Sequence, residues 1–226
     1  MMGQESTERT AALGRLELMQ LVVGRMAHAL RTQVGVSHGV ISDVQQGYTL
    51  SPEELADGSR ALQTILSVLG DLRDVAATPQ CSAEAVNLIV LAEHVQQRAS
   101  AVPDLALSIA ECETTVTVSV DTVMLVRALT AVLRYLAQRR PQKGRSIAVR
   151  MSVTTEPEPA LVIRGPRLSG TLPERHLSLA ELAAWDHGVQ SIGLIYAAEV
   201  LAVNRVQSDV ACTGDETAIS LVFERG

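Results

Sequence analysis

The first third of the chain carries a repeat of apolar residues that only a long α-helix can gather on one face. The repeat alternates spacings of three and four residues, through Leu16, Met19, Val23, Met26 and Leu30. This is the a/d pattern of helices that pack side by side along a seam. His28 falls at position f of the same register, opposite the seam. We therefore expect its imidazole to face solvent from a rigid helix.

The apolar pattern shifts just after this histidine. The next seam position is Gln33, and apolar spacing resumes only from Val34 through Ser37, Ile41 and Val44. One residue is skipped, which predicts a local change of helix phase or a bend at this point.

A second helix is predicted after a turn at residues 47–49. Residues 51–54, Ser-Pro-Glu-Glu, place a serine at the N-cap, a proline at N1 and a glutamate at N3, which is a complete capping box. Leu55, Leu62 and Leu69 then recur every seven residues, and the pattern runs to about Ala76. The two segments predict a helical hairpin over residues 11–78.

The hairpin has apolar residues on both flanks, and two helices cannot bury both flanks against each other. A second copy of the chain would cover the remaining apolar surface by forming a four-helix bundle. We therefore expect a homodimer. The alternative is that the second domain of the same chain covers this surface.

Beyond residue 78 the periodicities mix, which predicts a separate α/β domain over residues 79–226. Hydrophobic residues make up 47% of the chain and aromatic residues only 2%, so its core must consist of Leu, Val, Ala and Ile. Helices are predicted over 86–98, 121–139 and 191–203, and strands over 105–110, 115–120, 146–154, 160–163, 205–211 and 217–224. We expect an α/β sandwich with a sheet on one side and helices on the other.

Charge and hydropathy exclude two classes of partner. The formal net charge is −6 and no run of Lys or Arg is present, which argues against nucleic-acid binding. The most apolar N-terminal stretch, residues 18–30, is interrupted by Gln20, Arg25 and His28, so it predicts neither a membrane span nor a cleavable signal. We expect a cytoplasmic protein without a membrane partner.

The cysteines do not indicate a metal or redox site. Cys81, Cys112 and Cys212 are odd in number and far apart, without the close spacing of a zinc knuckle or a redox pair. We interpret them as buried free thiols. The histidines other than His28 share no ligand spacing either, so no metal site is predicted.

The order of hairpin and sandwich, with His28-Ala29-Leu30-Arg31-Thr32 on the first helix, resembles the catalytic region of two-component histidine kinases. The resemblance covers the chain from about Leu13 onward. It implies that the hairpin dimerises and carries His28 as phosphoacceptor, and that the sandwich is a Bergerat-type ATP-binding domain.

Within the phosphoacceptor box, His28, Leu30, Arg31 and Thr32 match the family pattern His-Glu-Leu-Arg-Thr-Pro. Ala29 and Gln33 replace its acidic residue and its proline. Thr32 resembles the position that orients water for receiver dephosphorylation. Arg31 and Arg25 are candidates to frame the phosphoryl group or to meet an acidic receiver surface, and ordinary solvated arginines are the equal alternative.

The resemblance also implies nucleotide-binding residues, and these are largely missing. Ala131 and Tyr135 occupy the asparagine positions of the helix that should hold Mg²⁺ and the nucleotide phosphates. Residues 161–166 stand where the adenine-recognition aspartate belongs and contain none. Of the glycine-rich lid box at 187–194, only Gly193 and Leu194 remain. We therefore expect a degenerate sandwich that binds neither ATP nor another cofactor.

The chain as a whole resembles a histidine phosphotransferase derived from a kinase. Such a protein passes phosphoryl groups between response-regulator aspartates, and the receiver domain of the partner supplies Mg²⁺. On this interpretation His28 is the catalytic phosphoacceptor, with Arg31 and Thr32 as auxiliary residues. The alternatives are a divergent ATP-dependent sensor kinase and a non-catalytic scaffold that binds a response regulator.

Overall fold

The computed structural model describes residues 2–76, 81–110, 115–139, 146–169, 176–186, 188 and 191–224. Within these ranges it places all side chains except those of residues 2–21, 67, 71 and 74–76. The chain divides into two compact units, residues 1–76 and 77–226, which we describe separately.

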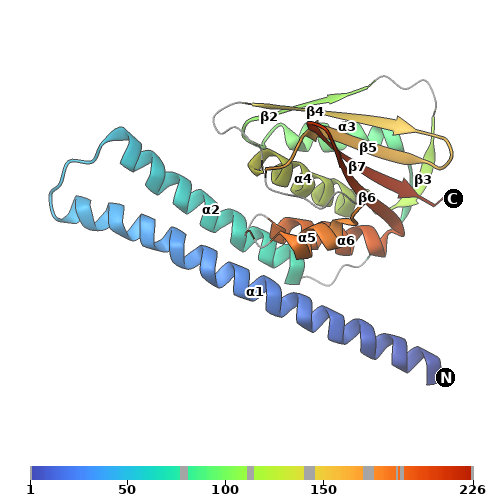
Figure 1. Ribbon diagram of the computed structural model, residues 1–226, viewed down its shortest axis with the longest axis horizontal. Coiled ribbons are helices and arrows are strands. Elements are labelled where there is room, and N and C mark those ends of the chain that lie inside the picture. The colour runs from blue at the N-terminus through green and yellow to red at the C-terminus, as the bar shows by residue number, and fades with distance from the viewer. Residues whose placement is uncertain are drawn as a thin grey trace. The chain divides into compact units, whose positions relative to one another are not determined.

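The first unit is a hairpin of two long helices, α1 (Met2–Gln45) and α2 (Pro52–Ala76), which confirms the predicted architecture (Figure 1). Helix α1 begins ahead of residue 11, the start that the sequence predicts. The turn between the helices includes Gly47, at a positive φ of 83° that favours glycine. The capping box of α2 forms as expected: the Glu54 amide donates to Ser51 Oγ at 3.2 Å, and the Ser51 amide donates to Glu54 Oε2 at 2.7 Å.

The hairpin buries one flank of each helix. Val22, Met26 and Ser37 of α1 and Ala61 and Val68 of α2 are buried. Met26 and Ser37 are eleven residues apart, which is about three turns of a straight helix. The buried positions of α1 therefore shift out of the heptad register after His28.

Four residues of the predicted seam and its continuation are more than half exposed rather than buried in the hairpin: Val23, Val34, Ile41 and Val44. Val23 is 57% exposed, because it lies one position away from the buried Val22 and so turns to the other flank of α1. Leu16 and Met19, also predicted on the seam, have side chains outside the described residues.

The second unit contains a five-stranded mixed sheet. Its strand order is β2-β4-β5-β7-β6, with β2 parallel to β4 and the other neighbours antiparallel. A separate antiparallel pair is formed by β1 (Glu84–Asn87) and β3 (Thr117–Val120). The strands of the large sheet are β2 (Leu105–Ile109), β4 (Ile147–Thr154), β5 (Ala160–Pro166), β6 (Val206–Thr213) and β7 (Glu216–Phe223).

Helices cover only one face of this sheet (Figure 1). They are α3 (Leu88–Ala99), α4 (Thr122–Gln138), α5 (Leu179–Trp185) and α6 (Ile192–Val203). Burial alternates along β4: Val149 and Met151 face the helices and are buried, while Arg150 between them is exposed. The predicted one-sided sandwich is thus confirmed, with an open face on the other side of the sheet.

The sequence misplaces one helix start and misses a helix. Residues 86 and 87, predicted as helical, belong to strand β1, and Asn87 instead caps α3 by accepting a 2.8 Å hydrogen bond from the Ile89 amide. Helix α5 has no counterpart among the predicted elements. The predicted start of α4 is confirmed, because the Asp121 side chain accepts from the Met124 amide at 2.9 Å.

Two expectations about the surface have different outcomes. Cys81 is exposed and Cys212 is half-buried, so the prediction of buried thiols is wrong for Cys81; Cys112 lies outside the described residues.

Within the described part of the chain, none of the helices combines the length and the apolar character needed to cross a membrane.

The close approach of α1 and α2 at Gly58 generates a first prediction. A Cβ at Gly58 would lie 3.2 Å from both Cγ atoms of Val40, whereas a Cβ at Gly70 of the same helix would meet nothing within 4 Å. Gly58→Leu should therefore lower the free energy of unfolding of the hairpin by about 2 kcal/mol through overpacking. Gly70→Leu is the matched control and should not lower it, as followed by urea unfolding at a fixed protein concentration. Equal losses in both variants would contradict the packing described here.

Candidate functional site

His28 lies at the middle of α1 with its side chain exposed. The backbone hydrogen bonds of the long helix fix the direction of the Cα–Cβ bond of His28. The helix backbone alone therefore positions the imidazole. One turn later the Thr32 hydroxyl donates to the His28 carbonyl oxygen at 3.2 Å. The imidazole is thus presented to solvent, while the nearest threonine hydroxyl is engaged with the backbone.

The helix face around His28 carries three glycines as well as exposed side chains. Gly24, Gly35 and Gly39 stand four residues before and seven and eleven residues after the histidine, positions that share its face. A Cβ at any of the three would meet nothing within 4 Å. Glycine inside a helix costs about 1 kcal/mol relative to alanine, and packing within the hairpin does not require it here. The arrangement leaves room for the backbone or side chains of another molecule to approach His28 closely.

The two arginines near His28 differ in accessibility. Arg31 is exposed and lies three residues after the histidine, on the adjoining part of the helix surface. Arg25 is only 8% exposed. Of the two candidates for framing a phosphoryl group, the structure therefore leaves Arg31 open to solvent beside His28 and buries Arg25.

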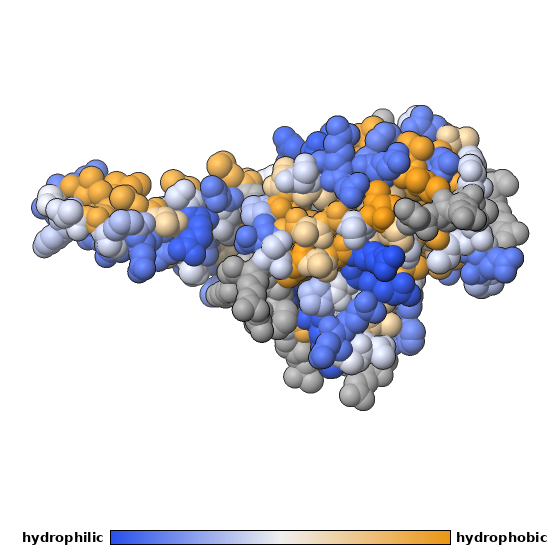
Figure 2. Space-filling model, turned by 90° about the horizontal axis from the view of Figure 1, so that it is seen from above, coloured by the Kyte–Doolittle hydropathy of each residue, from blue (hydrophilic) through white to orange (hydrophobic). Residues whose placement is uncertain are grey.

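A second flank of the hairpin is apolar and exposed. Leu55, Leu62, Leu66 and Leu69 form a stripe along α2 and are 46% to 70% exposed. On α1, Val23, Val34 and Ile41 are each more than half exposed. Apolar patches on the hairpin are visible at the left of Figure 2. We call these seven residues the apolar flank, a continuous surface of the kind that marks an interface.

In the second unit, the position implied for a nucleotide contains a buried hydrogen-bond network. Tyr135 is 2% exposed and its hydroxyl donates to Asp186 Oδ2 at 2.8 Å. Arg139 Nε donates to the same oxygen at 2.7 Å, and its Nη2 pairs with Oδ1. The Gly188 amide donates to Oδ1 at 2.7 Å. The Asp186 carboxylate thus ties the last turns of α4 to the segment between α5 and α6.

The network shifts the ionisation of all three side chains. Burial alone raises the pKa of the Asp186 carboxyl, but the hydrogen bonds from Arg139, the Gly188 amide and Tyr135 outweigh it and hold the pKa below its ordinary value. Burial and the Asp186 charge raise the pKa of the Tyr135 hydroxyl well above its usual range. The bond to Asp186 raises the pKa of the Arg139 guanidinium. At neutral pH the three groups are an ion pair with a neutral phenol.

These side chains do not fit a magnesium-bound nucleotide. Mg²⁺ takes compact oxygen ligands such as carboxylates, amides and waters. Here a phenol stands at the implied ligand position, and Asp186, the carboxylate beside it, is already held by an arginine, a tyrosine and an amide. No group of three or more candidate metal ligands occurs within the described residues.

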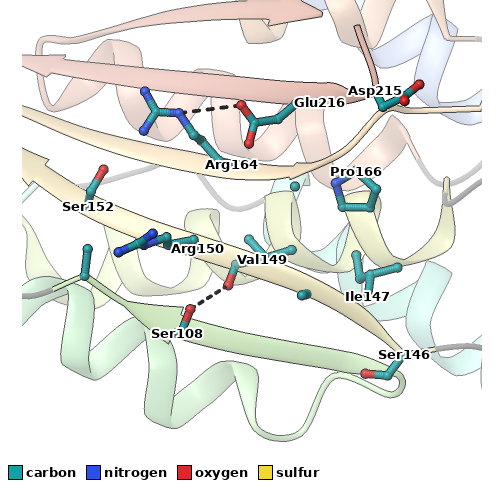
Figure 3. Close-up of a pocket in the computed structure, with 13 residues that line it drawn as sticks. Ser108, Ser146, Ile147, Val149, Arg150, Ser152, Arg164, Pro166, Asp215 and Glu216 are labelled. Carbon is teal, nitrogen blue, oxygen red and sulfur yellow. Dashed lines mark hydrogen bonds and ion pairs between the residues drawn. The ribbon is translucent and has the colours of Figure 1, made fainter. Parts of the chain in front are cut away.

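The segment implied for adenine recognition lies on β5. Ile163 faces the helices and is fully buried, whereas Arg164 points to the open face of the sheet. There it lines a hollow of about 890 Å³, directly across from Arg150 in the antiparallel register (Figure 3). Arg164 Nε lies 3.8 Å from Glu216 Oε2, and Asp215 adds a second carboxylate to the same hollow. Its two guanidinium groups are therefore balanced by two acids.

The remnant of the lid box lies at the start of α6. Ser191 is fully buried and its hydroxyl donates to the Gly188 carbonyl at 2.7 Å, which closes a tight turn directly after Asp186. Residues 187, 189 and 190 of the predicted box lie outside the described residues. Sequence reasoning missed Asp186 because it lies 51 residues from Tyr135, although an aspartate just before the lid box was a local signal.

Comparisons with known proteins agree with this architecture. No protein-family model matches the sequence, and neither does any of the curated proteins. Among solved structures, the chain is similar to the Acinetobacter baumannii histidine kinase AdeS, with 12% identity and a TM-score of 0.63, covering 88% of this chain and 98% of that chain. It is also similar to a bacterial phosphotransferase, with 17% identity and a TM-score of 0.51, covering 91% of this chain and 96% of that chain. The chain has the fold of the catalytic region of histidine kinases.

The Asp186 network generates a prediction about stability and pH. Asp186→Asn should lower the free energy of unfolding by about 3 kcal/mol at pH 7, because it leaves Arg139 without its partner. Since the pKa of Asp186 is lowered in the folded state, its stabilisation is complete above about pH 4 and is lost as the pH falls through the native pKa. Urea unfolding of both proteins at several pH values measures this difference.

The matched control for this experiment is Tyr135→Phe. It removes one hydrogen bond to Asp186 and should cost about 1 kcal/mol. The Asp186→Asn difference should shrink as the solution is acidified. A difference that stays constant down to about pH 2, below ordinary aspartate pKa values, would contradict the ionised network.

Proposed function

We propose that this protein is a histidine phosphotransferase of a two-component phosphorelay, which passes phosphoryl groups between the aspartates of response-regulator receiver domains through His28. The observation that carries the proposal is an exposed histidine on an open, glycine-lined helix face within a histidine-kinase fold. The similarity to a solved bacterial phosphotransferase over 91% of this chain supports it further.

The chemistry requires little from the protein besides position. The lone pair of one ring nitrogen of neutral His28 attacks phosphorus of the aspartyl phosphate, the phosphorus–oxygen bond breaks, and the aspartate leaves as a carboxylate. The proton on the other ring nitrogen stays in place. In the second step a carboxylate of the next receiver attacks the phosphohistidine and releases the imidazole. The receiver brings the Mg²⁺ that stabilises the moving charge.

Several features favour a receiver over ATP as the phosphoryl donor. An aspartyl phosphate is a reactive donor, so a neutral imidazole without acidic assistance is a competent nucleophile, and Ala29 offers no such assistance. Tyr135 and the engaged Asp186 replace the groups that would hold the metal and the phosphates of a nucleotide. The same sandwich then serves as a structural or docking domain.

The apolar flank supports a homodimer. Burying a leucine side chain contributes about 2 kcal/mol, and the flank exposes four leucines in each copy. An isologous pairing of two hairpins would bury both flanks in one four-helix bundle. Such a bundle presents two His28 faces, so each dimer offers two phosphoacceptor sites.

Phosphotransfer tests the role of His28. Receiver domains from the same organism, phosphorylated on aspartate with radioactive phosphate, should label the wild-type protein. The label should be stable to base and labile to acid, as a phosphohistidine is. His28→Ala should lose labelling, and His38→Ala, which removes another exposed histidine of the same helix, should keep it.

The other outcomes of this assay separate the alternatives. Label that persists in His28→Ala would overturn the assignment of the phosphoacceptor. Labelling by Mg-ATP alone, lost in His28→Ala, would identify a kinase and contradict the proposed donor. Receiver binding with no transfer in any variant would identify a scaffold.

The oligomeric state tests the role of the apolar flank. Leu66, 70% exposed on α2, is the most accessible leucine of the flank, so Leu66→Glu places a charge in the proposed interface at little cost to the monomer. Light scattering coupled to size-exclusion chromatography should show a dimer for the wild type and a monomer for this variant. Val123→Glu, at a 63% exposed valine of α4, should remain a dimer. A monomeric wild type would refute the interface.

A further inference from the structure

A groove on the second unit concentrates positively charged side chains. Helices α3 and α4 lie side by side beneath the sheet (Figure 1). The groove runs between them and has a volume of about 890 Å³. His94 and Arg98 of α3 and Arg127 and Arg134 of α4 line its walls. We call it the α3–α4 groove. It is distinct from the hollow of Figure 3, which lies on the open face of the sheet.

The lining of the α3–α4 groove contains more basic than acidic side chains. Glu84 is the one carboxylate among its described lining residues, against three guanidinium groups. Arg98 and Arg127 are exposed and make no ion pair with any described residue. The whole chain carries a net charge of −6, so this cluster departs from the surrounding surface. A complementary ligand must be negatively charged.

The floor of the groove is apolar and contains one unsatisfied polar atom. Val102 is buried, Val126 is half-buried, and Val123 at the edge is 63% exposed. The Thr122 hydroxyl oxygen is buried and has no hydrogen-bond partner among the described residues. A buried hydroxyl without a partner carries a desolvation cost.

The spacing of the charges indicates the shape of the ligand. Arg127 and Arg134 are seven residues apart on α4, so their Cα atoms lie about 10.5 Å apart along the helix axis. The lining from Thr122 to Arg134 extends about 18 Å. Acidic residues two turns apart on a bound helix have the same spacing as the two arginines, and its apolar side chains would meet the valine floor.

We propose that the α3–α4 groove binds an amphipathic acidic helix of a partner protein. Glutamates or aspartates on both edges of that helix pair with the arginines on the two walls, while its apolar stripe covers Val123 and Val126. The site uses none of the residues proposed for phosphotransfer. It therefore gives the second unit a docking role that does not depend on a nucleotide.

Fluorescence anisotropy with a defined probe tests this proposal. The probe is a labelled synthetic peptide of about 15 residues, roughly four helical turns, with leucines along one stripe and glutamates on both sides of it. We expect saturable binding to the full-length protein that weakens as salt is added. A peptide with every glutamate replaced by glutamine should bind at least tenfold more weakly.

Variants locate the binding. Arg98→Ala combined with Arg127→Ala should raise the Kd about tenfold, since each exposed ion pair contributes modestly. Arg150→Ala, which removes an exposed arginine on the open face of the sheet, should leave the Kd unchanged. His28→Ala should leave it unchanged as well.

Three results would overturn the proposal. One is the absence of saturable binding up to about 1 mM protein, the weakest Kd expected of a specific site. Another is equal affinity for the glutamate and glutamine peptides, which would indicate a purely apolar contact. The third is an unchanged Kd in the double arginine variant with an unchanged circular dichroism spectrum, which would place the peptide elsewhere.

Discussion

The buried carboxylate of Asp186 accepts hydrogen bonds from side chains on α4 and from the backbone just before α6. A carboxylate removed from water is stable only when such partners surround it. The ion pair with Arg139 lies at the end of α4, and the hydrogen bond from the Ser191 hydroxyl to the Gly188 carbonyl oxygen lies at the start of α6. The Asp186 carboxylate therefore links the end of α4 to the start of α6.

The same network supports the proposal that this fold acts here without ATP as phosphoryl donor. A nucleotide site needs polar groups that are held in place but unengaged until the ligand arrives. In this protein the polar groups of the corresponding region satisfy one another. Tyr135 and Arg139 have become structural partners of Asp186, which stabilises the sandwich without any ligand. Its surfaces are then free to serve other contacts.

Local sequence signals predicted much of the fold, because they act over a few residues. The serine cap of α2, the start of the helix predicted at residue 121 and the strand predicted over 146–154 all appear in the structure. Residues 86 and 87 were misassigned because a short apolar run fits a strand or a helix, and only pairing with β3 decides between them. The partner of Tyr135 lies 51 residues away, a distance at which spacing carries no information. The exposure of His28 followed from its register, whereas the burial of Arg25 did not.

The open face around His28 also limits what that face can recognise. Three glycines contribute no side chains, so under the proposed function a receiver that docks here meets His28, Arg31, Thr32 and bare helix backbone. Backbone is the same in every protein and cannot tell one receiver from another. Discrimination among similar regulators must then come from side chains outside this face. In the proposed relay, a change of partner would therefore require substitutions at side chains outside this face, while His28 and its glycines could remain unchanged.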